Sequence, residues 1–205
     1  MRVFELRLAQ FLLGKRMAVL PVRKAPDPVL LRKTSKVTKI DASIQRLIDD
    51  MFDTMYAKRG VGLAANQVGV PLRLCVMGIP DPEEEGQIVE YALINPEFVK
   101  RWDPEEMEEG CLSIPGYRGK ITRFTKVKVK ALDRDGKEVR LKGEGLLAQA
   151  LQHEIDHLNG VLYVDRMKEQ GTLDTLRELP KVPTDQLAEG RGPSEGEKIE
   201  EAAAA

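Results

Sequence analysis

The chain has 205 residues, of which 42% are hydrophobic and 32% charged, and its formal net charge is −1. This length suits one domain with a core of its own. The charge balance argues against a dedicated nucleic-acid binder, which would carry a basic excess, and no run of about 18 apolar residues predicts a membrane span. Two cysteines, Cys75 and Cys111, are too few for a disulfide framework, so a reduced, cytoplasmic setting is expected.

The two ends differ in composition from the part between them. Residues 1–16 are basic and apolar but lack a continuous hydrophobic stretch and a small-residue cleavage site, so a secretory signal is not favoured. Residues 183–205 are rich in Gly, Glu and Ala and cannot bury enough surface to offset the entropy of ordering. We therefore expect a mobile N-terminal extension (1–16), one folded domain (17–182) and a disordered acidic tail (183–205).

The strongest helical pattern covers residues 41–59. Asp41 can cap its start, and Gly60 can end it. Apolar residues recur at helical spacing along the segment: Ile44, Leu47, Ile48, Met51, Phe52 and Met55. This pattern predicts an amphipathic helix that packs on a core.

Strand signals follow this helix. Residues 72–79 and 88–94 are short apolar runs bounded by Pro and Gly, as strands often are. Residues 125–132 alternate between apolar and lysine side chains, and meet 138–141 across a turn at 133–136, which predicts a hairpin. Strands and helices do not alternate regularly. We therefore expect an α+β fold, with mostly antiparallel sheet around a central helix.

That central helix is predicted over residues 145–158, ended by Asn159 and Gly160. One stripe along it should anchor it in the core: Leu147, Leu151, Ile155 and Leu158. A second stripe carries the two histidines of the chain and continues toward the N-terminus through Leu146, Gln149 and Ala150. This second stripe can form one side of a substrate pocket, although simple packing in the core explains Leu146 and Ala150 equally well.

Both histidines lie in one pentapeptide, His153-Glu154-Ile155-Asp156-His157. Residues four apart lie on the same face of a helix, so the two imidazoles can share one cation. Glu154 between them is placed to take a proton from a metal-bound water. The motif predicts a metal-dependent hydrolase.

A catalytic metal usually has three protein ligands and one open position. The third ligand could be a Glu, an Asp or a Cys, and Cys111 stands next to a glycine in a stretch typical of turns. Cys75 lies instead in an apolar run, where a free cysteine is usually a small hydrophobic residue.

Three separated motifs, taken together, resemble those of the peptide deformylase family. They are Gly-Val-Gly-Leu-Ala-Ala-Asn-Gln at 60–67, Glu-Gly-Cys-Leu-Ser at 109–113 and Gln-His-Glu-Ile-Asp-His-Leu at 152–158. The resemblance covers about residues 17–166 and makes 17–182 the catalytic domain. It implies removal of the N-formyl group from the N-terminal methionine of nascent polypeptides, by attack of a metal-bound hydroxide on the formyl carbonyl.

The resemblance also implies a role for each site residue. The metal ligands would be Cys111, His153 and His157, holding ferrous iron, with zinc, nickel or cobalt able to replace it. Glu154 would be the general base and later the acid, and the oxyanion donors would be Gln67 and the backbone N–H of Leu112. Backbone groups that align the peptide would be those of Val61, Gly62 and Gly110.

Leu146 and Ala150 would hold the methionine side chain, and Glu109 would form an ion pair with Arg123. Gln149 is polar where the family's pocket favours an apolar residue. The implied partners are formylated nascent peptides and the ribosome that carries them, with no membrane and no sequence-specific nucleic acid.

Three other hypotheses for the function remain open. A zinc endopeptidase shares the His-Glu-x-x-His motif, but the chain is short and has no further histidine. A cysteine hydrolase would use Cys111 as nucleophile with a histidine base. A metal-stabilised binding domain would need no general base, which argues against it because Glu154 is present.

Overall fold

The computed structural model describes residues 18–180, so the expectations for 1–16 and for the tail at 183–205 lie outside the described residues. The α+β fold is confirmed. The strands are β1 (Gly62–Ala64), β2 (Leu74–Pro80), β3 (Ile88–Cys111), β4 (Ile114–Leu132), β5 (Glu138–Glu144) and β6 (Arg177–Glu178). The α-helices are α2 (Ala42–Ala57), α3 (Gly145–Leu158) and α4 (Tyr163–Gln170), and the 3-10 helices are η1 (Pro28–Leu31), η2 (Ala65–Val68) and η3 (Leu173–Thr175).

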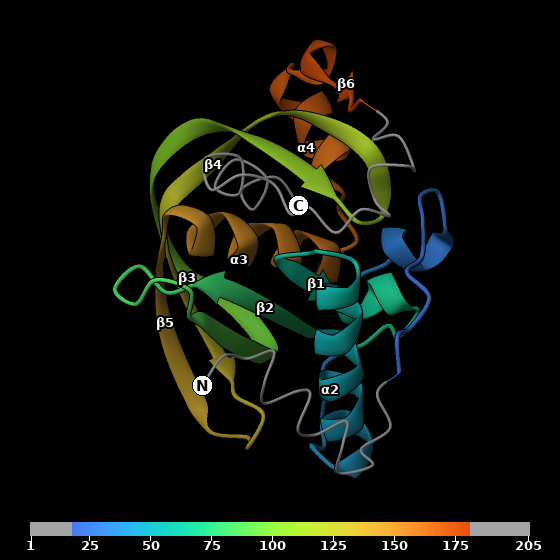
Figure 1. Cartoon of the computed structure of the whole chain (residues 1–205), viewed down its shortest axis with the longest axis vertical. Helices are drawn as coiled ribbons and strands as arrows, with labels where there is room; N and C mark the ends of the chain where they lie inside the picture. Colours follow the sequence, from blue (N-terminus) through green and yellow to red (C-terminus); the bar gives the residue numbers. More distant parts are fainter. Residues whose placement is uncertain (1–17, 181–205) are drawn as a thin grey trace.

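The strands form one sheet in the order β1-β2-β3-β4-β5, with β6 paired to β4, and these pairings are all antiparallel. Helix α3 runs through the middle of the molecule and contacts β1, β2, β4 and β5 (Figure 1). One hydrophobic cluster joins α3 to the sheet, and a second joins α2 to the sheet. The predicted central helix is therefore confirmed, with the predicted bounds.

Helix α2 begins as the sequence predicts and ends differently. The Asp41 side chain accepts hydrogen bonds from the N–H groups of Ser43 and Ile44. The helix ends at Ala57, where Arg59 takes the left-handed conformation (φ 55°) and the N–H of Gly60 donates to Met55 O at 2.9 Å. Gly60 is thus not the left-handed residue, because a Schellman turn closes one residue earlier.

The two central strands are longer than their sequence signals. The predicted strand at 88–94 continues as β3 to Cys111, and the predicted strand at 125–132 is the second part of β4. Pro96 and Pro104 lie inside β3, and the pairing with β4 shifts between Ile94 and Glu97. Prolines argue against a strand in sequence, but a bulge accommodates the first one here. The hairpin that joins β4 to β5 is confirmed.

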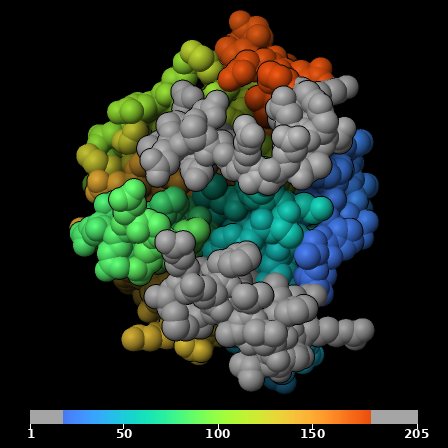
Figure 2. All heavy atoms as spheres, viewed as in Figure 1, coloured from blue at the N-terminus to red at the C-terminus, as the bar shows by residue number. Residues whose placement is uncertain are grey.

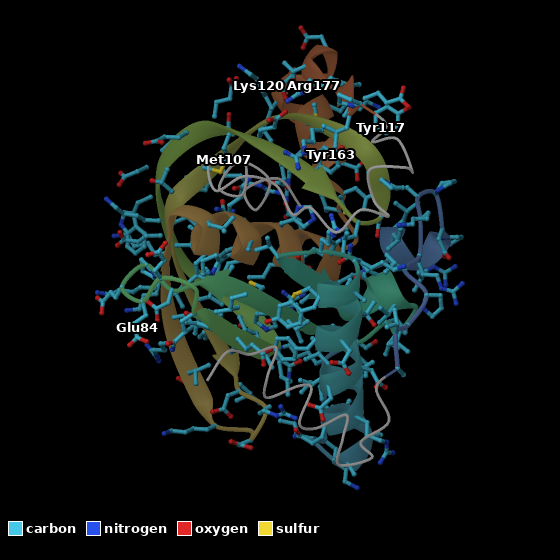
Figure 3. All side chains as sticks on the ribbon, in the orientation of Figure 1. Glu84, Met107, Tyr117, Lys120, Tyr163 and Arg177 are labelled. Carbon is cyan, nitrogen blue, oxygen red and sulfur yellow. The ribbon has the colours of Figure 1, made fainter. Side chains whose placement is uncertain are left out.

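Helix α4 was not predicted. Its two buried side chains, Tyr163 and Met167, pack against the far part of the β3–β4 hairpin. The Tyr163 hydroxyl donates to Tyr117 O at 3.2 Å, and both tyrosines lie in this region in Figure 3. A Cβ at Gly119 would lie 2.2 Å from the Met167 methyl carbon, so the end of this methionine side chain packs directly on the Gly119 backbone of β4.

The N-terminal part of the described chain runs along the surface to α2 (blue in Figure 2). The N–H of Leu20 donates to Thr54 Oγ1 on α2, and the N–H of Thr34 donates to Leu158 O at the end of α3. This segment therefore ties elements that lie far apart in the sequence. Among residues 18–180, no helix combines the length and the apolar character that crossing a bilayer requires.

Candidate metal centre

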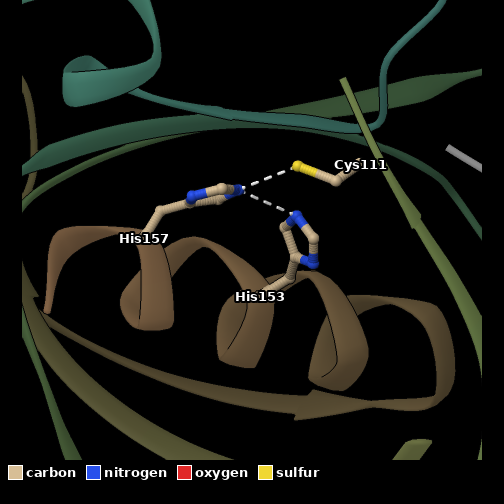
Figure 4. Close-up of side chains that lie close together, drawn as sticks. All are labelled: Cys111, His153 and His157. Carbon is tan, nitrogen blue, oxygen red and sulfur yellow. Dashed lines mark hydrogen bonds between the residues drawn. The ribbon is translucent and has the colours of Figure 1, made fainter. Parts of the chain in front are cut away.

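Three side chains converge where α3 passes the end of β3. Both imidazoles project from α3 toward Cys111, which is the last residue of β3 (Figure 4). His157 Nε2 lies 3.1 Å from Cys111 Sγ and 3.1 Å from His153 Nε2. One donor atom from each residue falls within a group no wider than 4.8 Å. The structure therefore brings together the three residues expected as metal ligands.

The donor set fits a transition metal. A thiolate and two imidazoles are a typical ligand set for zinc or iron, and three ligands leave a position for water. His153 Nδ1 donates a hydrogen bond to Glu109 Oε1 at 2.5 Å. The other ring nitrogen, Nε2, therefore faces Cys111 Sγ and His157 Nε2. A carboxylate behind a ligating histidine fixes the ring and its tautomer.

A buried chain of charges supports this histidine. Arg123 binds Glu109 through two hydrogen bonds of 2.9 and 2.8 Å, which confirms the expected ion pair. The same guanidinium reaches Asp156 Oδ2 at 2.5 Å, and Asp156 also accepts from Arg166 at 2.8 Å. Removing one member of such a buried set would leave a partner charge uncompensated, which costs about 3–5 kcal/mol.

The charges at the centre depend on one another. Burial would raise the pKa of the Cys111 thiol, but His157 and His153 hold that pKa well below its usual range. Burial would lower the pKa of His153, yet Glu109 and Cys111 hold it well above its ordinary value. The protein thus favours a thiolate at Cys111, which is the form that binds metal.

Glu154 lies on the same helix between the two histidines and is 3% exposed. Burial raises the pKa of its carboxyl to about 7, which suits a group that must take up and release a proton near neutral pH. Within the described part of the chain, Glu154 Oε2 has no hydrogen-bond partner. Gly62 makes room for this side chain, because a Cβ there would lie 2.3 Å from Glu154 Oε1.

Gln67 reaches the centre from η2. Its Oε1 accepts from Ala64 N at 2.9 Å, which turns its amide NH₂ toward the site. That NH₂ lies 3.1 Å from Ser113 Oγ and 3.6 Å from Cys111 Sγ. Leu112 occupies the two-residue turn between Cys111 and Ile114, and the next amide, Ser113 N–H, donates to Cys111 Sγ at 3.3 Å.

A pocket beside the centre holds about 330 Å³ of empty space, part of it open to solvent. Its lining includes four of the five expected substrate-binding residues, with Gln149 and three residues of the centre: Val61, Gly62, Leu146, Ala150, Gln149, Glu109, His153 and Glu154. The fifth, Gly110, is buried between Glu109 and Cys111 on β3. The amide of Gln149 donates to Glu108 O at 2.8 Å, so a backbone carbonyl satisfies its polar end.

Three residues that contribute to the site were not predicted from the sequence. Asp156 and Arg166 complete the charge chain behind Glu109, and Ser113 contacts both Gln67 and the thiolate. Asp156 lies inside the histidine motif and Ser113 lies two residues after Cys111, so both stood beside a residue already singled out. Arg166 gave no such signal. Cys75, as expected, is a fully buried core residue.

Comparison with known proteins identifies relatives of the chain. The family profile described as polypeptide deformylase matches residues 19–172. The peptide deformylase of Dehalococcoides mccartyi (strain CBDB1) is 49% identical over 173 residues, which cover 84% of this chain and 98% of the relative. That of Halothermothrix orenii is 52% identical over 151 residues, covering 74% and 95% of the two chains.

Solved structures agree. A crystal structure of peptide deformylase from Ehrlichia chaffeensis in complex with actinonin has a TM-score of 0.70 and 42% identity, and the match covers 77% of this chain and 95% of the other. The peptide deformylase of Thermotoga maritima has a TM-score of 0.67 and 41% identity, over 74% and 97% of the chains.

Proposed function

The chain belongs to the peptide deformylase family, and from this premise we propose how its residues divide the reaction. The enzyme removes the N-formyl group from nascent polypeptides. The reaction adds water across a formamide C–N bond and yields formate and a free amine. A formamide carbonyl is a poor electrophile, so the site must activate water, stabilise an oxyanion and protonate the leaving nitrogen.

In this proposal the metal would be held by Cys111 Sγ, His153 Nε2 and His157 Nε2. The ion in the cell would be ferrous iron. A divalent ion bound by these residues would lower the pKa of water toward neutrality and would thus make hydroxide available at physiological pH. The convergence of the three donor atoms supports the ligand set. Iron is proposed from the family resemblance; zinc, nickel or cobalt can bind the same ligands. Metal analysis of protein purified without oxygen tests the choice of iron.

Glu154 is the proposed general base and acid. It takes a proton from the attacking water and later delivers a proton to the departing amine nitrogen. Its burial, its raised pKa of about 7 and the hydrogen-bonding capacity of Oε2 support this role. The pKa lies close to the working pH, so the carboxyl can serve in both directions.

Gln67 and the backbone N–H of Leu112 stabilise the oxyanion in this proposal. Donors are effective here when they are already in place as charge develops on the carbonyl oxygen. The amide of Gln67 is held by Ala64 N and Ser113 Oγ, so it need not reorganise during the reaction. Leu112 lies directly beside the thiolate ligand, in a turn of two residues.

The substrate binds as an added strand, with its methionine side chain in the pocket. Strand β1 is an end strand of the sheet, so the backbone around Val61 and Gly62 can pair with an extended peptide. In this proposal the backbone of Gly110 also helps to align the peptide. Leu146 and Ala150 supply apolar walls for an unbranched thioether side chain. Gln149 adds its aliphatic stem, since its amide is bound to Glu108 O.

We place the enzyme in the cytoplasm, where ribosomes supply formylated chains, and a ribosome contact is part of the proposal. Cosedimentation with ribosomes at moderate salt tests that contact. The convergence of Cys111, His153, His157 and Glu154 beside an apolar pocket carries the mechanism.

The decisive assay compares formyl-Met, acetyl-Met and internally cleavable peptides with metal-loaded enzyme under anaerobic conditions. We expect formate from the formylated peptide alone, loss of activity with a strong chelator and recovery with ferrous iron. Cleavage of the internal peptide, or activity that survives chelation, would contradict the proposal.

A further inference from the structure

A surface segment, residues 23–25, contacts both parts of the proposed oxyanion site. The N–H of Arg23 donates to Gln67 O at 2.7 Å, and the N–H of Ala25 donates to Ser113 O at 2.9 Å. Between them, the Lys24 ammonium donates to the carbonyl of Leu112. Gln67 and Leu112 come from different elements, η2 and the β3–β4 turn, so three consecutive residues bridge them.

The Lys24 contact leads directly to the thiolate ligand. The Leu112 carbonyl and the Ser113 N–H belong to one peptide group, and that N–H donates to Cys111 Sγ at 3.3 Å. A cation on the oxygen of a peptide polarises its N–H and strengthens the hydrogen bond that it donates. Hydrogen bonds to a ligating sulfur tune the electron density that it gives to a metal.

The turn depends on contacts from outside. With only two residues between β3 and β4, it is held by the Leu112 side chain against Gly60 and by Gln67 Nε2 on Ser113 Oγ. A Cβ on Gly60 would lie 2.8 Å from Leu112 Cδ1, so that packing is close. Among the donors that hold this turn in the described chain, Lys24 is the charged one.

We propose that Lys24 is a positioning residue, which acts through the Leu112–Ser113 peptide to hold the oxyanion donor of Leu112 and to tune the Cys111 thiolate. The inference rests on the proposed roles of Cys111 and Leu112. It concerns a lysine at the surface, outside the three motifs that carry the family resemblance. Replacing it therefore leaves the core and the metal ligands as they are.

The test compares Lys24→Met, which keeps the aliphatic stem, with Lys24→Arg, which keeps a charged donor. In cobalt-loaded protein, Lys24→Met should move the sulfur-to-cobalt charge-transfer band to lower energy, because the thiolate loses a polarised donor. Its kcat should fall on the order of tenfold with KM changed less than about twofold, less than the loss for removing an oxyanion donor outright. Lys24→Arg should restore both the band and kcat.

Lys58→Met is the matched control. Burial lowers the pKa of Lys24, and the Cys111 thiolate opposes this shift. The positive charge of Lys58 lowers the pKa of Lys24 further, so Lys58 is a second cation near Lys24. It caps α2 rather than holding the turn. An unchanged band and kcat in Lys24→Met would overturn the proposal, as would equal effects in Lys58→Met, which would indicate a general field effect.

A further variant and the choice of readout keep the test decisive. Should Lys24→Met fail to fold, Lys24→Gln replaces it; this variant keeps a neutral donor and should change the same two readouts by less. The spectrum does not depend on deformylation, so an inactive wild type would contradict the proposed function while the band still decides the role of Lys24.

Discussion

Helices α2 and α3 both pack on the sheet, yet they bury different kinds of side chain. The buried residues of α2 are apolar apart from Thr54. Helix α3 buries Gln152, Glu154, Asp156 and His157 beside its leucines. An apolar face needs only shape and volume from its neighbours, whereas each buried polar group needs a particular partner.

The partners of α3 come from the strands around it. Gln152 exchanges two hydrogen bonds with the backbone of Phe124, at 2.7 and 3.0 Å, and Asp156 binds Arg123. Substitutions in α2 should therefore change stability and leave the chemistry of folded molecules intact. Substitutions of Glu154 and of the two histidines on α3 should mainly change the chemistry.

The largest effect is expected at Glu154. General acid–base catalysis contributes about 10² to 10⁴ in rate, so Glu154→Ala should lose at least that much in kcat. Glu154→Asp, with the carboxylate one methylene shorter, should fall between Ala and wild type. Metal content of the purified Ala variant should stay near that of the wild type. Near-normal turnover, or metal loss like that of a His153 variant, would contradict the role of Glu154.

The two cysteines sharpen the comparison, since both are buried and Cys111 is the one that lies against the two histidines. Burial raises the pKa of Cys75 well above its usual value, whereas the histidines hold that of Cys111 far below it. Cys111→Ser should weaken metal retention at least about tenfold, because a neutral hydroxyl replaces a thiolate. Cys75→Ser should lose about 1–3 kcal/mol of stability and keep its metal, as measured by elemental analysis. A trapped acyl group on Cys111 would contradict its assignment as a ligand.

In α2, Met51 is fully buried and is the matched test of packing. Met51→Ala should reduce the free energy of unfolding by about 2–5 kcal/mol, because it removes buried contacts and leaves a cavity. Denaturant titration measures this loss. Turnover per folded molecule should match the wild type at a temperature where the variant is folded; a large drop in kcat would break the distinction between the helices.

A smaller effect concerns pH. Burial raises the pKa of Glu154 from 4.5 to about 7 in the metal-free protein, so between these values the native state binds more protons than the unfolded state. Stability should therefore fall as pH rises through this window, relative to Glu154→Gln, which cannot ionise. Urea unfolding of both metal-free proteins from pH 4 to about 8 measures the difference. Parallel curves would contradict the raised pKa.

No effect is expected from the first residues. The family match begins at residue 19, and the site contacts described here begin at Arg23. A chain that begins at Met17 should match the full chain in melting temperature and kcat. A loss of several degrees would mean that 1–16 packs on the body.

Local signals predicted the helices well, and long-range contacts explain what was missed. The bounds of α3 and the Asp41 cap follow from spacing and from side-chain chemistry within one turn. That Cys111 meets the histidines came from family resemblance, since spacing alone left Glu, Asp and Cys open. Helix α4 was missed because it is short and polar, with only Tyr163 and Met167 buried. The link from Arg166 through Asp156 joins elements whose approach only the fold determines.

The shortness of strand β1 also bears on self-association of the protein. An end strand with an open backbone can pair with another copy of the same chain and start aggregation. Here that edge is three residues long, Gly62–Ala64, and η2 follows it at once. It is long enough to register the first residues of one extended peptide and too short to template a second sheet. In the proposed binding mode this edge, which pairs with no further strand among residues 18–180, would serve the substrate and offer little backbone to a second copy of the chain.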